Sequence, residues 1–154
     1  MRLSVTTPRG ALVETDVDEV TAPGELGEFG VLPGHVPLMS ALKPGVLWYK
    51  SKDRSGVIAV GQGYLQVAQL VQAQGHAQGH TDDHGQGRDR VLVLVDQALN
   101  AGDVDRAAAD RDLSAAEREL AAWTGELDGA HHALVIRRGW AQARLDAADR
   151  VAPH

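Results

Sequence analysis

Three histidines at spacings of four, His76, His80 and His84, stand beside Asp82 and Asp83 and form a group of potential metal ligands. Imidazole and carboxylate groups together suit zinc, nickel or copper. A helix would align the three imidazoles on one face, but glycines recur through the segment and disfavour a stable helix. A flexible loop also lacks the outer hydrogen bonds that hold metal ligands in place. We predict a polar insertion without a resident metal, with adventitious metal binding or mild pH sensing as the alternative.

A fourth histidine, His35, lies in the stretch 27–38, which holds three glycines, two prolines and five apolar residues. Solvent loops rarely combine so many turn-forming residues with so many apolar ones, so we predict a tight, irregular loop tethered to a core. His35 could cap its own turn, or act with nearby carboxylates in a small hydrolase. The sequence offers no convincing nucleophile or acid–base pair, and we therefore predict a protein that is not itself an enzyme.

Composition narrows the class of protein. The chain has 154 residues, a formal net charge of -6 and no cysteine. This length predicts one core, or one core with a small appendage. The acidic balance argues against a nucleic-acid partner, and the missing cysteines exclude disulfides and thiolate metal sites. No signal peptide is apparent and the longest apolar run is Val91–Val95, so we expect a cytoplasmic-side protein that meets a membrane only through other subunits.

The first part of the chain, from residue 2 to about 67, reads as a series of short strands separated by turn signals such as Pro44-Gly45. Many short strands at such spacing favour a β-sandwich or barrel. Apolar residues alternate with their neighbours at Leu3 and Val5, Val46 and Trp48, Ile58 and Val60, and Leu65 and Val67. The run Val91–Val95 does not alternate. We predict that it packs against the sandwich on one face and against helices on the other.

The remainder divides into a polar insert and a helical tail. The insert covers about 68–90 and should form a long loop that the sandwich tolerates, because loop closure becomes only slowly more unfavourable with length. We therefore predict a β-sandwich domain over 1–98 and an α-helical hairpin domain over 99–154.

The tail is rich in alanine and charged residues. Asp103 is the predicted N-cap of its first helix, and the capping box at 114–117 allows that helix to restart there. One apolar stripe follows helical spacing along Val104, Ala107, Ala108, Leu113, Ala116, Leu120 and Trp123. A break over 124–129 precedes a second helix over about 130–150, so the two helices should be antiparallel neighbours. Because alanine buries little area, we expect the hairpin to be weakly attached to the sandwich.

The stretch 27–38 resembles the signature loop of the epsilon subunit of F-type ATP synthases, with the pattern G-E-x-G-x-x-P-G-H-x-P-L. Further blocks match that family in order, and the resemblance covers nearly the whole chain except 68–90. These blocks are 42–45, 57–61, 63–67, 91–96 and the tail 99–150. The resemblance implies an N-terminal β-sandwich followed by a C-terminal antiparallel two-helix hairpin, which agrees with the pattern of strands and helices above.

The resemblance also implies a function. Epsilon subunits are non-catalytic rotor subunits of the central stalk, which link the gamma subunit to the c-ring so that proton flow drives ATP synthesis. Such a subunit would lie at the cytoplasmic face of the bacterial membrane as part of the complex. The resemblance assigns Glu28 to the surface that faces the c-ring, with Glu25 and Phe29 beside it, and His35 to the surface that faces gamma.

Some bacterial epsilon subunits bind ATP through an I/L-D-x-x-R-A stretch at the start of the first tail helix. The matching residues here begin at Val104 and Asp105, but Ala108 occupies the arginine position. Arg106 or Arg111 would point to other helix faces. We therefore expect no cofactor and, at most, weak regulatory ATP binding.

The second tail helix is net basic, and the resemblance implies that Arg137, Arg138 and Arg144 contact an acidic segment of the catalytic alpha/beta subunits and oppose ATP hydrolysis. The alternative is an ordinary solvated helix face of mixed charge. A competing interpretation of the whole chain is a free-standing metal-binding β-sandwich that uses the histidine loop, but this leaves the signature loop and the helical tail unexplained.

Overall fold

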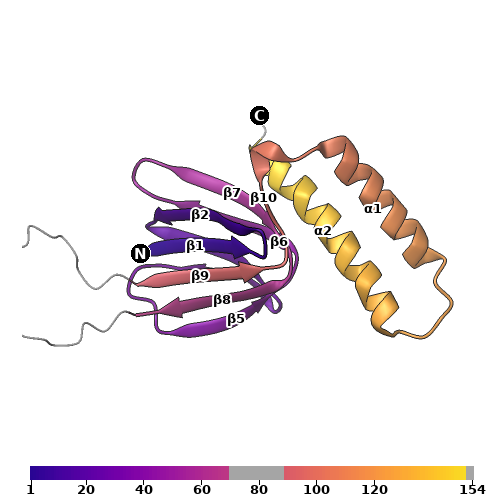
Figure 1. Ribbon diagram of the computed structural model, residues 1–154, viewed down its shortest axis with the longest axis horizontal. Coiled ribbons are helices and arrows are strands. Elements are labelled where there is room, and N and C mark those ends of the chain that lie inside the picture. Colours follow the sequence, from indigo (N-terminus) through magenta and orange to yellow (C-terminus); the bar gives the residue numbers. More distant parts are fainter. Residues whose placement is uncertain (70–88, 152–154) are drawn as a thin grey trace, which may run out of the picture.

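The computed structural model describes residues 1–69 and 89–151 (Figure 1). In these residues ten strands precede a short 3-10 helix and two α-helices. The strands are β1 (Arg2–Thr7), β2 (Gly10–Asp16), β3 (Glu19–Gly24), β4 (Gly27–Val31), β5 (Leu38–Leu42), β6 (Gly45–Lys50), β7 (Ser55–Val60), β8 (Gly63–Ala68), β9 (Arg90–Val95) and β10 (Ala98–Asn100). The helices are η1 (Ala101–Asp103), α1 (Arg106–Ala121) and α2 (Gly129–Val151).

The strands form one continuous sheet that folds into two layers. Its order is β10-β7-β6-β3-β5-β8-β9-β1-β2, and β4 pairs with β3 outside this path. The sheet turns over where Gly24 of β3 pairs with Leu42 of β5. Neighbouring strands are antiparallel except β1 and β9, which run parallel. The predicted β-sandwich followed by a two-helix hairpin is confirmed.

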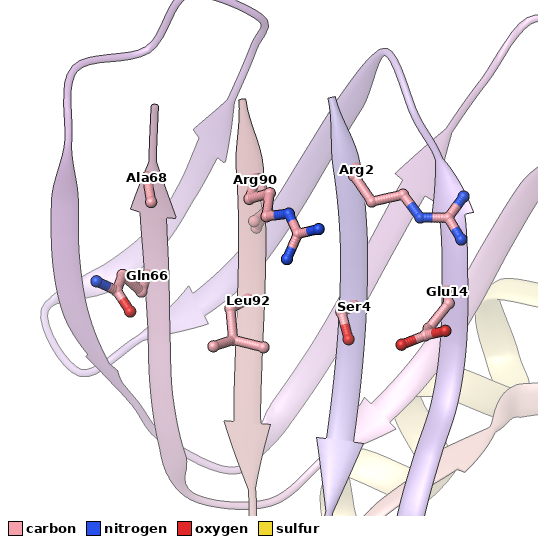
Figure 2. Close-up of a pocket in the computed structure, with 8 residues that line it drawn as sticks. Arg2, Ser4, Glu14, Gln66, Ala68, Arg90 and Leu92 are labelled. Carbon is pink, nitrogen blue, oxygen red and sulfur yellow. The ribbon is translucent and has the colours of Figure 1, made fainter. Parts of the chain in front are cut away.

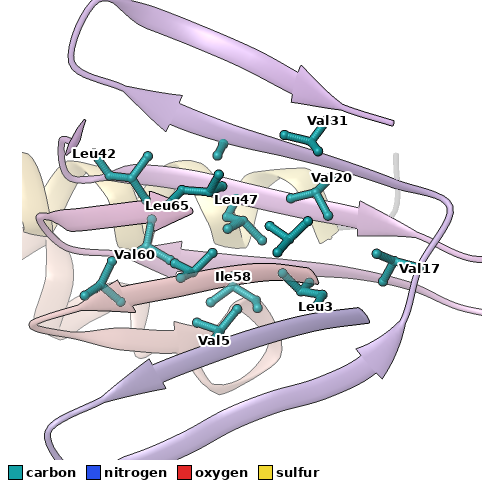
Figure 3. Packing of buried hydrophobic residues seen from close by; sticks show 14 of the residues in the cluster. Leu3, Val5, Val17, Val20, Val31, Leu42, Leu47, Ile58, Val60 and Leu65 are labelled. Carbon is teal, nitrogen blue, oxygen red and sulfur yellow. The ribbon is translucent and has the colours of Figure 1, made fainter. Parts of the chain in front are cut away.

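The core lies between the two layers and is almost entirely aliphatic (Figure 3). Alternate residues point inward along β1, β8 and β9, as the period of two requires. Both layers contribute fully buried side chains, the largest being Leu3, Leu42, Leu47, Ile58 and Leu65. No residue of the two α-helices belongs to this cluster, so the sandwich encloses its core without them.

The prediction that Val91–Val95 is covered on both faces is wrong. Val91, Val93 and Val95 are buried, but Leu92 is half-buried and Leu94 is 49% exposed on the opposite face of β9. The strands that the helices cover on their outer face are β6 and β7. There Leu47 and Ile58 point into the core, while the intervening apolar side chains meet α2.

The tail differs from its prediction at the start of the first helix. Asp103 ends the 3-10 helix, and Asp105 is the N-cap of α1, its carboxylate accepting the N–H of Ala108 at 3.0 Å. The helix then continues through Ser114 without a restart. Asp128 caps α2 in the same way, accepting the N–H of Ala130 at 3.0 Å. The two helices lie antiparallel beside the sandwich (Figure 1).

Helix α2 attaches to the sandwich through small residues. Val46, Ala59, Ala101 and Ala147 form a second buried cluster, with Val57 and Trp140 packed against it. Gly139 lies against the Pro44 ring, and a Cβ there would come within 3.2 Å of the Pro44 Cβ. Because alanine and glycine bury little apolar area, this interface stabilises the docked helix less than a leucine-rich one would.

Candidate functional site

The β3–β4 hairpin carries the three residues predicted to face the c-ring. Glu25 and Leu26 form its tight turn, and the Leu26 side chain is fully exposed at the tip. Glu28 and Phe29 lie on β4, so the prediction that the whole stretch 27–38 is an irregular loop is wrong for its first half. Gly27 permits the hairpin because it adopts a φ of +131°, a conformation that side-chain-bearing residues rarely take.

Phe29 anchors this hairpin to the core. Its ring packs on the core and lies against Gly24, where a Cβ would come within 2.9 Å of the ring. A glycine is needed there because the hairpin backbone and the ring leave no room for a side chain. Phe29 therefore positions the turn, whereas Glu25 and Leu26 form its exposed surface.

Glu28 forms an ion pair with the tail. Its Oε2 lies 3.5 Å from Nη2 of Arg150, and both side chains are about half exposed. Asp149, the neighbour of Arg150, pairs in turn with Arg106 at 2.6 Å. The two elements border a hollow of about 540 Å³, which Lys43 and Asp146 also line. A carboxylate assigned to the c-ring surface by resemblance thus contacts the last turn of α2 in this structure.

The second half of the stretch, residues 32–37, is the predicted irregular loop. Gly34 has a φ of +85°, and its N–H donates to the Asp89 carboxylate at 2.6 Å. The His35 Nδ1 lies 2.7 Å from the Val36 carbonyl oxygen. Since a carbonyl only accepts, the Nδ1 donates and the Nε2 remains available to a partner. Gln69 donates to the His35 carbonyl at 3.3 Å, so the loop is fixed against the ends of β8 and β9.

Strand β4 separates these two surfaces. The turn at Glu25 and Leu26 precedes its first residue, and the His35 loop follows its last. At about 3.3 Å per residue the two ends of β4 are about 13 Å apart. The candidate contacts therefore lie at opposite ends of the same strand.

The residues named for a nucleotide site take structural positions. Asp105 caps α1, so its carboxylate already accepts a backbone N–H. The N–H of Val104 donates to the Ala101 carbonyl at 3.4 Å, and Arg111 is exposed on α1. Val104 and Asp105 therefore connect η1 to α1.

The three arginines named as an inhibitory basic face are all paired with acids of α1. Arg144 contacts Asp112 at 2.8 Å, Arg138 contacts Glu117 at 3.4 Å, and Arg137 contacts Glu119 at 3.6 Å. Arg144 is the most buried of the three, with 15% of its side chain exposed, and its guanidinium lies over the Trp140 ring. As the residue numbers of the acids on α1 rise, the numbers of their arginine partners on α2 fall. The pairs therefore form a ladder between antiparallel helices. We call these three pairs, with Arg106–Asp149, the interhelix ladder.

The outer face of β5, β8 and β9 exposes apolar side chains that the sequence analysis did not select. Met39, Tyr64 and Leu94 are 65%, 58% and 49% exposed. Strand alternation places each of them on the face opposite the core-facing residues, so the alternating pattern of the sequence could have predicted the exposure of Met39 and Tyr64. In the run Val91–Val95 every residue is apolar, so alternation could not show that Leu94 is exposed. Leu26 is a single apolar residue in a turn, and no periodic pattern marks it.

The histidines His76, His80 and His84, considered above as candidate metal ligands, lie outside the described residues. Over 1–69 and 89–151, no group of three or more His, Asp or Glu side chains is arranged to hold a metal ion. In the same ranges no helix is both long and apolar enough to cross a membrane.

Comparison with known proteins identifies relatives along most of the chain. The family model for the delta/epsilon chain β-sandwich domain of ATP synthase matches residues 1–71. An ATP synthase epsilon chain from an Anaeromyxobacter species is 37% identical over 150 residues, covering 97% of this chain and 98% of that one. Epsilon chain 2 of Syntrophotalea carbinolica is 37% identical over 109 residues, and the match spans 71% of this chain and 65% of the relative.

Solved structures share the fold at lower identity. A chain of the Euglena gracilis mitochondrial ATP synthase (OSCP/F1/c-ring) covers 96% of this chain with a TM-score of 0.60 and 17% identity, the match spanning 76% of that chain. A chain of the Tetrahymena thermophila mitochondrial ATP synthase central stalk and c-ring covers 96% of both chains, with a TM-score of 0.56 and 15% identity. Since an epsilon chain matches almost end to end at 37% identity, this chain belongs to the ATP synthase epsilon chain family.

Proposed function

We propose that this protein is the rotor subunit that links the gamma subunit to the c-ring in the central stalk of an F-type ATP synthase. In this role it transmits torque from proton flow to the catalytic head, where other subunits make ATP. The protein itself is non-catalytic. It would associate peripherally with the cytoplasmic face of a bacterial membrane through its partners.

The observation that carries this proposal is the placement of two exposed surfaces at opposite ends of β4. A linker must hold two partners at a fixed separation, and β4 can do so because it is paired along its length with β3 and anchored in the core through Phe29 and Val31. Residues at the two ends come from one short stretch of sequence, 25–36, so a single rigid element connects them.

The end with the Glu25–Leu26 turn is the proposed c-ring contact. It presents a carboxylate, Glu25, beside a fully exposed leucine, and a second carboxylate follows at Glu28. Carboxylates at such a tip can pair with basic or amide groups and fix the register of a partner, while the leucine supplies apolar area.

The end with the His35 loop is the proposed gamma contact. Leu32 and Val36 are exposed on either side of His35, and Met39 is exposed where β5 begins. Exposed apolar residues gathered around a polar group are typical of protein interfaces. The free Nε2 of His35 adds one hydrogen-bonding group to that surface.

Gel filtration of this protein with the gamma subunit of the same organism tests the proposal. We expect a one-to-one complex at micromolar concentrations, and the double variant Leu32→Asp/Val36→Asp should weaken it. A matched variant at the other end, Leu26→Asp, should leave the gamma complex intact. Elution of the wild-type proteins as separate species would contradict the proposal.

We also propose that the tail regulates ATP hydrolysis. The basic residues Arg137, Arg138 and Arg144 pair with α1 in this conformation, so they could reach an acidic segment of the alpha/beta subunits only after the helices separate. The weak alanine-lined attachment of α2 is consistent with such release. Removal of residues 101–154 should raise the ATPase activity of the assembled enzyme, and unchanged activity would count against inhibition.

We propose that this regulation operates without tightly bound nucleotide. Asp105, the matching aspartate of the family's ATP-binding stretch, accepts a helix N–H, and Ala108 stands at the arginine position. Isothermal titration with ATP should give no saturation at micromolar nucleotide. A micromolar dissociation constant that Asp105→Asn abolishes would overturn this proposal.

A further inference from the structure

Two arginines lie on neighbouring positions of the parallel strands β1 and β9. Arg2 and Arg90 are direct neighbours in the register of that pair, and the next residues on the same face are Ser4 and Leu92. Like charges placed directly opposite on neighbouring strands destabilise a sheet. An anionic group bound between the two arginines would offset this repulsion.

Among the described residues, carboxylates neutralise only part of the positive charge of Arg2 and Arg90. Arg2 lies 3.7 Å from Asp16, and both side chains are about half exposed. Within the described residues, no acidic side chain pairs with Arg90. The adjacent carboxylate, Asp89, is already bound to the Gly34 N–H at 2.6 Å. Among the described residues, the Arg90 guanidinium therefore has no carboxylate partner and can accept one from another protein.

The two arginines border a hollow of about 300 Å³ in the outer face of the sheet (Figure 2). Leu92 and Ser4 lie further along the same two strands, and Gln66 and Glu14 flank them on β8 and β2. Glu14 is opposite Ser4 in register, one row away from the arginines. The hollow therefore has a cationic end and a partly apolar floor, with the Gln66 amide on one side and the Glu14 carboxylate on the other, one row from the arginines.

The hollow continues into the exposed apolar residues of the same face. Leu92 lines it, and Leu94 follows two residues later, opposite Tyr64 of β8. Met39 of β5 is opposite Gln66, which also lines the hollow. Arginine, tyrosine and methionine are the residue types enriched at protein interfaces. A small free anion would have no need of this apolar surface, so the combination favours a protein ligand that brings its own carboxylate.

We propose that Arg2 and Arg90 together bind a carboxylate side chain of the protein that docks on this face. Resting on the function proposed above, that protein is the gamma subunit. Guanidinium groups bind a carboxylate through paired N–H donors, which fixes both position and orientation. The arginine pair thus sets the register of gamma on the sheet, while the His35 loop and the apolar residues supply contact area.

Titration of labelled gamma with the double variant Arg2→Gln/Arg90→Gln tests this proposal. We expect its affinity to be weaker than wild type by about tenfold or more, because a desolvated carboxylate on gamma is left unpaired. Wild-type affinity should fall as salt rises, and that dependence should be smaller in the variant. Arg90→Lys should lose part of the affinity, since it keeps the charge but not the planar fork.

Arg54→Gln is the matched control, because Arg54 is an exposed arginine in the turn between β6 and β7. It should bind gamma like the wild type, and thermal melting should confirm that all variants fold. If wild type binds and the double variant binds equally well with the same salt dependence, the carboxylate site is wrong but the gamma partnership stands. If the wild type does not bind gamma, the proposed function and this site both fail.

Discussion

Single residues set the close approaches on which this fold depends, and Gly63 is one of them. A Cβ at Gly63 would overlap the carbonyl oxygen of Leu94 and come within 2.7 Å of the Cα of Val95. At Gly30 the nearest atom to a Cβ would be the Val20 carbonyl oxygen at 4.0 Å. Both glycines lie in strands, but only Gly63 lacks space for a methyl group.

Gly63→Ala should therefore lower the free energy of unfolding by about 1–3 kcal/mol, because β8 and β9 must separate to admit the methyl group. Gly30→Ala should change it by about 0.5 kcal/mol or less. Urea unfolding followed by circular dichroism measures both. Equal effects of the two substitutions would show that backbone contact at Gly63 is not limiting.

The start of α1 provides a second contrast at this scale. Asp105→Ala should destabilise the helix by about 1 kcal/mol, since the N–H of Ala108 loses its acceptor. Asp103→Ala, two residues earlier in the 3-10 helix, should have little effect. Hydrogen exchange at the first turn of α1 reports the difference, and faster exchange in Asp103→Ala than in Asp105→Ala would contradict the assignment of the cap.

At the scale of elements, the interhelix ladder fixes how α1 and α2 lie together. The residues buried in these helices are mostly alanines, so apolar contact alone specifies their register weakly. Four ion pairs spaced along the seam supply the specificity. Exposed pairs of this kind stabilise little individually, and salt screens them.

A double-mutant cycle at Arg144 and Asp112 should give a favourable coupling of about 0.5–1 kcal/mol, because Arg144 is mostly buried. Arg144→Glu should loosen the hairpin, and Asp112→Arg added to it should recover part of the loss. The matched cycle at Arg138 and Glu117 should give a coupling close to zero, since both side chains are half exposed. Equal coupling in the two cycles would mean that burial does not strengthen the pair.

The elements also show what the sequence could predict. Strands marked by alternation and turns, and helices marked by apolar spacing, can be predicted because these signals are local, whereas the N-cap of α1 is Asp105 and not the predicted Asp103. The second face of β9 was misassigned because α2 packs on β6 and β7, a choice that no local pattern records. Similarly, Glu28 could be named from its motif, but its ion pair with Arg150 joins residues far apart in the chain.

At the scale of the whole molecule, the sandwich and the hairpin depend on each other unequally. The main core is contained in the strands and the segment between β2 and β3, and α2 covers β6 and β7 from outside. The hairpin, by contrast, buries the apolar side chains of α2 against β6 and β7. The sandwich should therefore be the independent folding unit.

A chain of residues 1–100 should accordingly fold, retain its β-type circular dichroism spectrum and bind gamma with an affinity within a few-fold of the full protein. Its thermal midpoint should fall, because Val46 and Ala59 become exposed. Dispersed amide signals in a nuclear magnetic resonance spectrum would verify the fold. A collapsed spectrum would show that the helices are needed to complete the sandwich.

The parallel pairing of β1 with β9 has a consequence for the order of folding. Leu3 and Val5 are synthesised first, but their neighbours in the sheet, Val91 and Val93, are synthesised only after the seven strands β2 to β8. The first strand can pair with β2 early, yet its other edge stays open until β9 arrives. Because such distant pairings form slowly, closure of β9 onto β1 should limit the folding rate, and the tail helices should assemble afterwards on a finished surface.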